Sequence, residues 1–214
     1  MVQAVEKTAP EHLSVNEKKW DSWAETYDNK RFNFFRHFQK RAVLMAQLKN
    51  GQRFLDIGCG TGWAVCYAAS TMSGNGEFYG IDMAPKMIEK ARENSGGLKN
   101  VRFQKALVEE LPFESDFIDN AICTNSFHHY LDPVKALTEI RRVLKPGGRV
   151  YILDATTDNI IIKLADKRMK SRQPEHVKLY STAEFRELFP KAGLKYVKSI
   201  PVWPLKVHIG EKVL

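Results

Sequence analysis

Short apolar runs alternate with helix-like patterns from residue 51 to residue 154 of this 214-residue chain. We predict strands over residues 53–57, 77–81, 101–104, 118–123 and 149–154, and helices over residues 63–72, 85–94 and 133–144. Pro85 and Pro133 fall in a first helical turn, where proline is tolerated, and Pro146 with the two glycines after it ends the third helix. This alternation predicts a mostly parallel sheet covered by helices.

The pattern changes after residue 154. Ser181, with Glu184 three residues later, is the signature of a helix N-terminus, and Gly193 ends that helix. Residues 194–200 and 205–209 follow as two apolar runs. The connection between them is too short for a crossover helix, so we expect this pair to be antiparallel. The sequence therefore predicts a doubly wound, Rossmann-like α/β sheet of seven strands, mostly parallel, with an antiparallel final strand.

Two segments precede this domain, which we place at residues 51–214. Residues 1–15 are polar and without periodicity, so we expect a flexible tail there. From residue 16 to residue 50, aromatic and apolar positions recur at helical intervals with a break near residues 29–33. We interpret residues 16–50 as a pair of N-terminal helices that form a lid.

The composition changes this picture little. Hydrophobic residues make up 43% and charged residues 27%, as in a folded domain. No apolar run reaches the roughly 18 residues of a membrane span, and the first residues lack the apolar stretch of a secretory signal. Cys59, Cys66 and Cys123 form no C-x-x-C pair. We therefore expect a cytoplasmic protein with reduced thiols.

A glycine-rich turn follows the first strand, in the segment LDIGCGTG at 55–62. Its glycines stand at 58, 60 and 62, whereas a dinucleotide fingerprint would need one at position 63, where this chain has Trp63. The spacing argues against NAD. The second strand ends at Asp82, about 20 residues past the loop, where a carboxylate can accept hydrogen bonds from a ribose. Capping of the helix that begins at Pro85 is the alternative role for Asp82.

Several ordered motifs surround this loop. They are WDSWAETYD at 20–28, GIDMAPKMIEKAR at 80–92, LPFESDFID at 111–119, HHYLDPVKALTEIRRVLKPGGRVYILD at 128–154 and STAEFRELFPKAGL at 181–194. Together with the loop, they make the chain resemble the class I S-adenosylmethionine-dependent methyltransferases. Within that class, the chain is similar to the small-molecule branch that includes the ubiquinone and menaquinone biosynthesis enzymes. The resemblance covers roughly residues 16–200.

The resemblance implies S-adenosyl-L-methionine as cofactor and S-adenosyl-L-homocysteine as product. It places the residues of the loop, Gly58, Cys59, Gly60 and Gly62, against the methionine and adenosyl parts of the cofactor. It places Asp56 at the cofactor amino group, directly or through water.

The resemblance also implies the contacts of the nucleoside. Asp82 would hold the ribose, and Met83 would pack on the adenine. Similar enzymes usually carry an acidic residue just before the residue that meets the adenine edge. Here the aligned pair is Leu107-Val108, which leaves a backbone N–H of Val108 or the side chain of Glu109 as the contact.

Three further residues are candidates on the acceptor side. Tyr27 follows an A-x-x-Y-D pattern that closes over the methionine end of the cofactor in similar enzymes; packing with Trp20 and Trp23 on one helical face is its alternative role. Asn125 and His128 follow the fourth strand, at the edge where open sheets bind ligands. We assign Tyr27 and His128 as candidate catalytic residues and Asn125 as a further cofactor contact. For His128, packing is again the alternative.

The charge distribution bears on the acceptor. Residues 51–162 carry 12 basic and 14 acidic side chains, whereas residues 163–214 carry 12 and 5. We expect a small-molecule acceptor, and this basicity favours an anionic one. The alternative is that these basic residues simply form a solvated surface. A nucleic-acid or protein methyltransferase and a non-catalytic cofactor-binding regulator are the alternative functions. Nucleic acid is disfavoured, because Thr124-Asn125-Ser126-Phe127 stands where base methyltransferases carry N-P-P-Y. We find no metal-ligand cluster, and the residues leave open whether carbon, nitrogen or oxygen is methylated.

Overall fold

The computed structural model describes residues 9–28, 30–72 and 75–214, and it places seven strands in one sheet. The strands are β1 (Arg53–Ile57), β2 (Glu77–Asp82), β3 (Val101–Lys105), β4 (Ile118–Thr124), β5 (Leu144–Ala155), β6 (Lys195–Val202) and β7 (Leu205–Glu211). Their order is β3-β2-β1-β4-β5-β7-β6. Strands β1 to β5 pair in parallel, and β7 runs antiparallel to both β5 and β6. The predicted fold is confirmed, including its antiparallel final strand.

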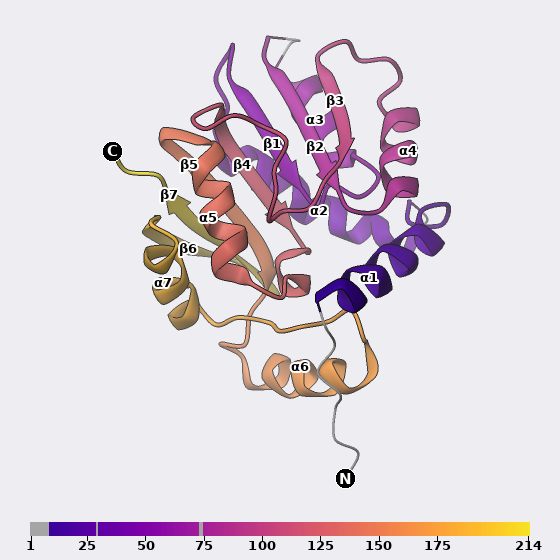
Figure 1. Cartoon of the computed structure of the whole chain (residues 1–214), viewed down its shortest axis with the longest axis vertical. Helices are drawn as coiled ribbons and strands as arrows, with labels where there is room; N and C mark the ends of the chain where they lie inside the picture. Colours follow the sequence, from indigo (N-terminus) through magenta and orange to yellow (C-terminus); the bar gives the residue numbers. More distant parts are fainter. Residues whose placement is uncertain (1–8, 29, 73–74) are drawn as a thin grey trace.

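Helices cover both faces of this sheet (Figure 1). They are α1 (Ala9–Trp23), α2 (Lys30–Met45), α3 (Trp63–Thr71), α4 (Pro85–Asn94), α5 (Pro133–Val143), α6 (Ile160–Arg172) and α7 (Thr182–Lys191). Buried side chains of α2, α3 and α4 share one hydrophobic cluster with the sheet, and those of α5 and α7 share a second one. The sheet is therefore the middle of three layers, as a doubly wound fold requires.

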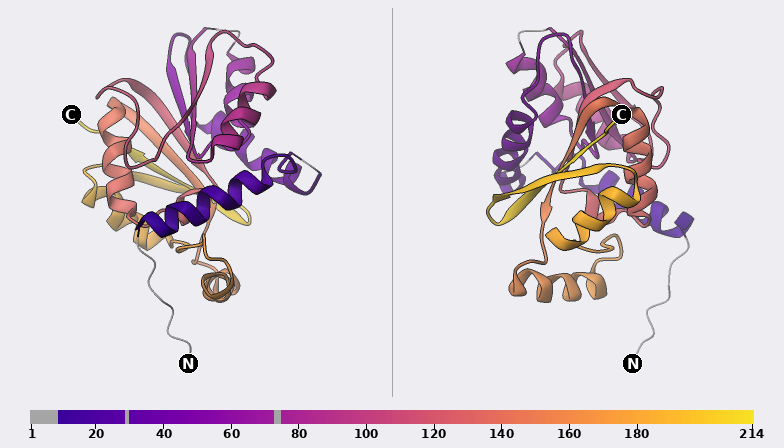
Figure 2. Two further views of the ribbon diagram at one scale, coloured as in Figure 1. Left: turned by 45° about the vertical axis from the view of Figure 1, so that its right-hand side comes forward. Right: turned by 90° about the vertical axis from the view of Figure 1, so that its left-hand side faces the viewer.

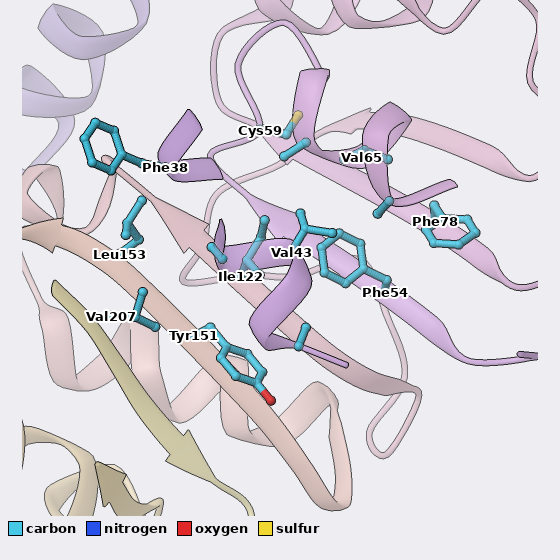
Figure 3. Close-up of a cluster of buried hydrophobic side chains, with 14 of the residues drawn as sticks. Phe38, Val43, Phe54, Cys59, Val65, Phe78, Ile122, Tyr151, Leu153 and Val207 are labelled. Carbon is cyan, nitrogen blue, oxygen red and sulfur yellow. The ribbon is translucent and has the colours of Figure 1, made fainter. Parts of the chain in front are cut away.

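The first cluster shows how the N-terminal helices belong to the core. Phe38 and Val43 of α2 are buried against Phe54 of β1 and Ile122 of β4, at the centre of the sheet (Figure 3). Because these side chains lose nearly all contact with water, α2 is part of the main hydrophobic core. Residues 16–50 are thus two different elements: α2 packs on the sheet, and α1 crosses its edge (Figures 1 and 2).

Local signals in the sequence explain several element boundaries. Pro85 and Pro133 begin α4 and α5, and the side chain of Asp132 accepts a hydrogen bond from the backbone of Lys135. Ser181 and Glu184 form a reciprocal capping box at the start of α7. Each of these signals lies within four residues of the end that it specifies.

Two predictions for the N-terminal helices were wrong: where the first helix begins and where it ends. Residues 9–15, which we expected in a flexible tail, form the first turns of α1, because His12 and Asn16 are buried against the rest of the protein. The tail expected at residues 1–8 lies outside the described residues. Helix α1 ends at Trp23 and α2 begins at Lys30, so the break begins earlier than predicted. No described helix is long and apolar enough to cross a bilayer.

Helix α6 was not predicted at all. Asn159 caps it through a hydrogen bond from the backbone of Ile161, but the helix buries only Asp166. Its large aliphatic side chains are exposed, so the helix lacks the core-facing apolar stripe from which helices are usually recognised.

Candidate functional site

A cavity of about 370 Å³ lies at the carboxyl edge of the sheet. Its walls come from α1, from the loops that follow β1, β2, β3 and β4, and from the start of α5. In open α/β sheets, this edge is where ligands bind, because the loops there diverge on both sides of a change in strand order. The change lies here between β1 and β4, which pair although two strands separate them in the sequence.

The loop after β1 forms the floor of this cavity. Gly58 and Gly60 line it, with φ of 72° and 52°, a backbone region that favours glycine. A side chain at Gly58 would also collide with Ser126, because an ideal Cβ there would lie 2.2 Å from Oγ. The backbone N–H groups of Gly58 and Cys59 both donate to the carbonyl of Ile81, each over 2.9 Å. These contacts hold the loop close to the end of β2.

Two residues of the loop lie outside the cavity. Cys59 is buried, and its sulfur would come within 2.9 Å of a side chain at Gly80. Gly62 faces α4 and β3, where an added Cβ would lie 2.6 Å from the ring of Phe103 and 2.9 Å from Ala91. The structure therefore gives Cys59 and Gly62 a packing role beneath the loop and no place in the cavity wall. Their expected contact with a cofactor stays a prediction.

Asp82 stands where the loop and the cavity meet. One carboxylate oxygen accepts from the backbone N–H of Gly60 over 2.9 Å, and the other accepts from that of Ala84 over 2.9 Å. Asp82 therefore orders the residue that caps α4, the alternative role stated above, and also lines the cavity. Burial raises the pKa of this carboxyl above its ordinary value. Further donors inside the cavity would stabilise its charged form.

Asp56, near the end of β1, is completely buried. Neither carboxylate oxygen has a hydrogen-bond partner among the described residues. Burial, and next the nearby charge of Asp82, raise the pKa of Asp56 to about 8. A buried carboxyl without a donor is costly, so native proteins usually supply a partner. The side chain does not contribute to the cavity wall, but the residue stands in β1 only two positions before Gly58, which does. An amino group bound above this loop would fit it as a partner.

Tyr27 covers the loop from the other side. It lines the cavity, and its ring lies 3.6 Å from the position that a Cβ of Gly60 would take. The ring also packs edge-on against Trp20, with centroids 6.3 Å apart. Burial, followed by the charges of Asp82 and Asp28, raises the pKa of Tyr27 to about 12. The phenol therefore stays protonated at neutral pH, which suits a wall or a hydrogen-bond donor rather than a base.

The turn that carries Tyr27 is tied to the glycine loop. Asp28 accepts a hydrogen bond from the hydroxyl of Thr61 over 2.9 Å and one from the amide of Asn94 over 2.9 Å. It also pairs with Arg36 of α2 over 2.9 Å. The A-x-x-Y-D pattern thus supplies two residues with separate tasks: Tyr27 faces the cavity, and Asp28 fixes the turn.

The residues that we predicted for the adenine side line one cavity. Met83, Leu107, Val108 and Glu109 all line the cavity, together with Ala106. The backbone N–H of Ala106 donates to the carbonyl of Asp82 over 3.0 Å, which holds the loop after β3 beside the end of β2. Glu109 is therefore close enough to the cavity to replace the acidic residue that the aligned positions lack.

Of the candidate residues after β4, one lines the cavity and one does not. Asn125 lines the cavity with φ of 53°, whereas His128 does not line it. The His128 ring turns toward Asp154, whose two carboxylate oxygens lie 2.9 and 2.8 Å from Nδ1. The backbone N–H of His128 donates to the same carboxylate. The neighbouring His129 is the histidine of this pair that faces the cavity, with its ring centroid 4.0 Å from that of His128.

Several wall residues were missed in the sequence. His12 and Asn16 of α1 lie in the segment or at the boundary that we interpreted as a tail, and Nε2 of His12 lies 2.9 Å from the carbonyl of His129. Asp132 and Lys135 line the cavity from the start of α5. Only the helix signal of Asp132 was visible in the sequence, because the other contacts join distant segments. Within the described residues, no three His, Cys, Asp or Glu side chains are grouped to hold a metal ion.

Comparison with known families decides what kind of domain this is. Residues 48–193 match the family described as "Methyltransferase domain". The chain belongs to this methyltransferase domain family. The matched range runs from just before β1 to the end of α7 and contains the glycine loop, Asp82 and the β4 loop. The first 47 residues, with α1 and α2, precede it.

Relatives of this methyltransferase domain share part of its length. It is 32% identical over 170 residues to an uncharacterized methyltransferase, YcgJ, of Bacillus subtilis, covering 78% of this chain and 66% of the relative. It is 33% identical over 138 residues to a demethylmenaquinone methyltransferase of Staphylococcus aureus, covering 62% and 57%. The chain thus spans about two thirds or less of these relatives' length.

Solved structures show the same fold. A SAM-dependent methyltransferase from Aquifex aeolicus superposes with a TM-score of 0.67 at 27% identity, over 97% of this chain and 100% of that one. The YcgJ structure gives a TM-score of 0.68 at 32% identity, over 78% and 71%. The first of these alignments extends over nearly the whole methyltransferase chain, including the region before residue 48.

Proposed function

We propose that this protein transfers the methyl group of S-adenosylmethionine to a small-molecule acceptor. One observation carries the proposal: a single cavity joins the glycine loop, Asp82 and Tyr27, and the buried carboxyl of Asp56, two positions before that loop, has no hydrogen-bond partner among the described residues. These are the groups that the amino acid and nucleoside parts of this cofactor require. The family and the solved relatives support the same reading.

Each part of the cavity has a task toward the cofactor. Asp82 holds Gly60 and Ala84, and its remaining lone pairs would accept the ribose hydroxyls. Asp56 would pair with the amino group, which is why its burial without a protein partner is tolerated. Met83 and Leu107 supply apolar surface for the adenine. When bound, the cofactor supplies a methyl group that is already activated on a sulfonium, so the protein needs no metal for the transfer.

The remaining task of the protein is to align the acceptor and exclude water. Trp20 and Tyr27 cover the loop, and His12 holds α1 against the carbonyl of His129. Holding the reacting atoms in line against such a wall and excluding water can account for several orders of magnitude in rate. His128 is the proposed base for an acceptor that must lose a proton: Asp154 holds its Nδ1 and leaves Nε2 to accept. Because the ring lies outside the cavity wall, it would act through a bridging water.

A small acceptor suits the cavity better than a polymer. Part of the wall is formed by apolar and aromatic side chains such as Leu13, Tyr130 and Leu131. Pockets of this composition and size take compact molecules. The relatives named demethylmenaquinone methyltransferase support the same class of acceptor.

We also propose that the acceptor is anionic. The basic residues that would attract it lie outside the cavity. Lys135 lines the wall beside Asp132 and Glu109, so the wall itself offers little net positive charge. The five basic residues of segment 163–172 lie on α6, which does not line the cavity. They would act at a range of about 10 Å at 0.1 M salt and mainly raise the rate of encounter. The value of kcat/KM should then fall with ionic strength, while cofactor affinity barely changes.

Calorimetry followed by an activity screen tests the proposal. The protein should bind S-adenosylmethionine and S-adenosylhomocysteine but not NAD. A screen of small acceptors with radiolabelled cofactor should then identify at least one labelled product. Absence of heat with either cofactor form would refute the proposal, and binding without transfer to any acceptor would instead identify a cofactor-binding regulator.

A further inference from the structure

Helix α6 stands apart from the body of the protein, below the carboxyl edge of the sheet (Figures 1 and 2). It is held from one side by Asp166, whose carboxylate accepts from the backbone N–H of Leu179 over 2.8 Å and lies 2.7 Å from Nε2 of His176. Lys170 completes this anchor at 3.1 Å. Because Asp166 is buried, the helix cannot roll without breaking these contacts, so its opposite face is fixed toward the outside.

That outer face carries large aliphatic side chains in its first turns. Ile160, Ile161 and Leu164 are 67%, 72% and 60% exposed. Ile160 and Leu164 are four positions apart and therefore share one face, opposite Ile162 and Asp166. Single exposed aliphatic residues are ordinary, but three within five positions of an outward helix form an apolar patch that water covers at a cost.

Unpaired cations surround this patch. Lys163, Lys167, Arg168 and Arg172 are exposed, and no carboxylate of the described residues lies within salt-bridge distance of them. At 100° per residue, Lys163 and Lys167 lie beside Ile160, and Arg168 lies between Leu164 and Ile161. The exposed face of α6 therefore carries aliphatic side chains and cations together, as helices that lie in a membrane interface do.

We propose that α6 docks the protein on an anionic lipid bilayer. The cations match the charge of the headgroups, and the aliphatic side chains enter the boundary between the headgroups and the acyl chains. A nucleic acid would satisfy the cations but leaves the aliphatic side chains in water, and so does an acidic polypeptide. A purely apolar partner would leave the cations unpaired. An anionic bilayer is the surface that accepts both the cations and the aliphatic side chains of α6.

An exposed aromatic residue extends the same surface. Trp203, in the turn between β6 and β7, is 86% exposed. The strand after this turn is tied to the chain just before α6, because Lys206 pairs with Asp158. Tryptophan is enriched where proteins meet the headgroup region, since its ring is amphipathic. The docking surface therefore comprises α6 and the β6–β7 turn.

Docking on this surface would bring the cavity toward the lipid. The segment after α6 contacts both walls of the cavity mouth: Nδ1 of His129 lies 2.8 Å from the carbonyl of Glu175, and the carboxylate of Glu175 pairs with Lys19 of α1. Contact of α6 with a bilayer thus places the carboxyl edge of the sheet, with its cavity, on the membrane side. This inference does not depend on methyl transfer, so it can fail or hold separately from the proposed function.

Co-sedimentation with vesicles tests the proposal on the whole protein. We expect it to sediment with vesicles of phosphatidylcholine and phosphatidylserine in equal amounts and to remain in solution with phosphatidylcholine alone. Raising the salt concentration should release it, because exposed charges are screened. The triple variant Lys163→Gln, Lys167→Gln, Arg168→Gln should weaken vesicle binding by about a hundredfold. The pair Ile160→Gln, Leu164→Gln should weaken it by about tenfold with the charge unchanged.

Matched controls lie at the opposite edge of the sheet. The triple variant Lys49→Gln, Lys99→Gln, Lys195→Gln removes the same charge from exposed lysines at the amino ends of β1, β3 and β6, and it should bind vesicles as the unchanged protein does. All variants should keep their affinity for S-adenosylmethionine, since α6 lines no part of the cavity. That affinity shows that they fold.

Three results would overturn the proposal. They are absence of binding to the anionic vesicles, equal loss in the two triple variants, and full binding by the aliphatic pair variant. Retention of polyglutamate or of RNA by the aliphatic pair variant, together with full vesicle binding, would assign α6 to a soluble polyanion instead.

Discussion

The backbone N–H of Gly60 donates a hydrogen bond of 2.9 Å to the carboxylate of Asp82, and this contact joins the end of β2 to the loop after β1. The two residues are 22 positions apart in the sequence and both line the cavity. The carboxylate that is proposed to hold the ribose therefore also shapes the loop that is proposed to receive the amino acid part. A change at Asp82 should act on both halves of the cofactor site.

The first prediction concerns this carboxylate. Replacement Asp82→Ala should weaken binding of S-adenosylmethionine by about 1–3 kcal/mol, the usual loss for hydrogen bonds to an ionised group. Asp82→Asn should lose less, because its amide oxygen can still accept from one backbone N–H. Calorimetry measures both, with Glu114→Gln as a control for an exposed carboxylate outside the cavity. Unchanged affinity in Asp82→Ala would contradict the assignment.

The second prediction follows from the raised pKa of Asp56, to about 8. The folded protein holds the Asp56 proton more tightly than the unfolded chain, whose carboxyl has an ordinary pKa near 4. Stability of the cofactor-free protein should therefore fall as the pH rises from about 4 to about 8. Asp56→Asn should lack this contribution and be more stable at pH 8, by about 1–3 kcal/mol.

Denaturant unfolding at pH 5 and pH 8 measures this effect. The difference between the two proteins should be small at pH 5 and largest at pH 8. The same substitution should weaken cofactor binding, because the proposed partner of the amino group is lost. A gain in stability without any loss of cofactor affinity would show that Asp56 is a buried acid with no role in binding.

The sequence predicted what is encoded locally and missed what depends on distant contacts. The capping box of Ser181 and Glu184 was visible because both residues belong to one helical turn. The start of α1 was not, because it depends on His12, whose partner His129 is 117 positions away. Helix α6 was missed for the same reason: its anchor is a polar residue, Asp166, bound to a later segment. The same holds for the site. The glycine loop was predicted from a local motif, whereas the part of the cavity wall that α1 forms was missed.

The third prediction treats α1 as a lid. If α1 closes over bound cofactor, its backbone amides should exchange more slowly with solvent after S-adenosylmethionine is added. His12→Ala removes the contact with the carbonyl of His129 and should raise exchange in α1 of the cofactor-free protein. Tyr27→Ala should lower cofactor affinity, whereas Tyr27→Phe should keep most of it if the ring acts as a wall. Exchange that is indifferent to cofactor would identify α1 as a fixed part of the domain.

The last prediction separates catalysis from packing at His128. Asp154 holds Nδ1 of this histidine, so Nε2 is the atom that would accept a proton from the acceptor. Once an acceptor is known, His128→Gln should lower kcat by about 10²–10⁴, the usual contribution of a general base, with little change in cofactor affinity. Asp154→Asn should lower kcat as well, because the imidazole loses the carboxylate that orients it.

The exposed histidine of α2 provides the control, because His37→Gln changes the same residue type on an element that is separate from the β4 loop and should leave kcat unchanged. A general base also leaves a signature in the pH profile, which a packing residue does not. The dependence of kcat on pH should therefore differ between the unchanged protein and His128→Gln. If His128→Gln is fully active but less stable, the pair of His128 and Asp154 holds the β4 loop in place, and His129, which faces the cavity, becomes the histidine to test.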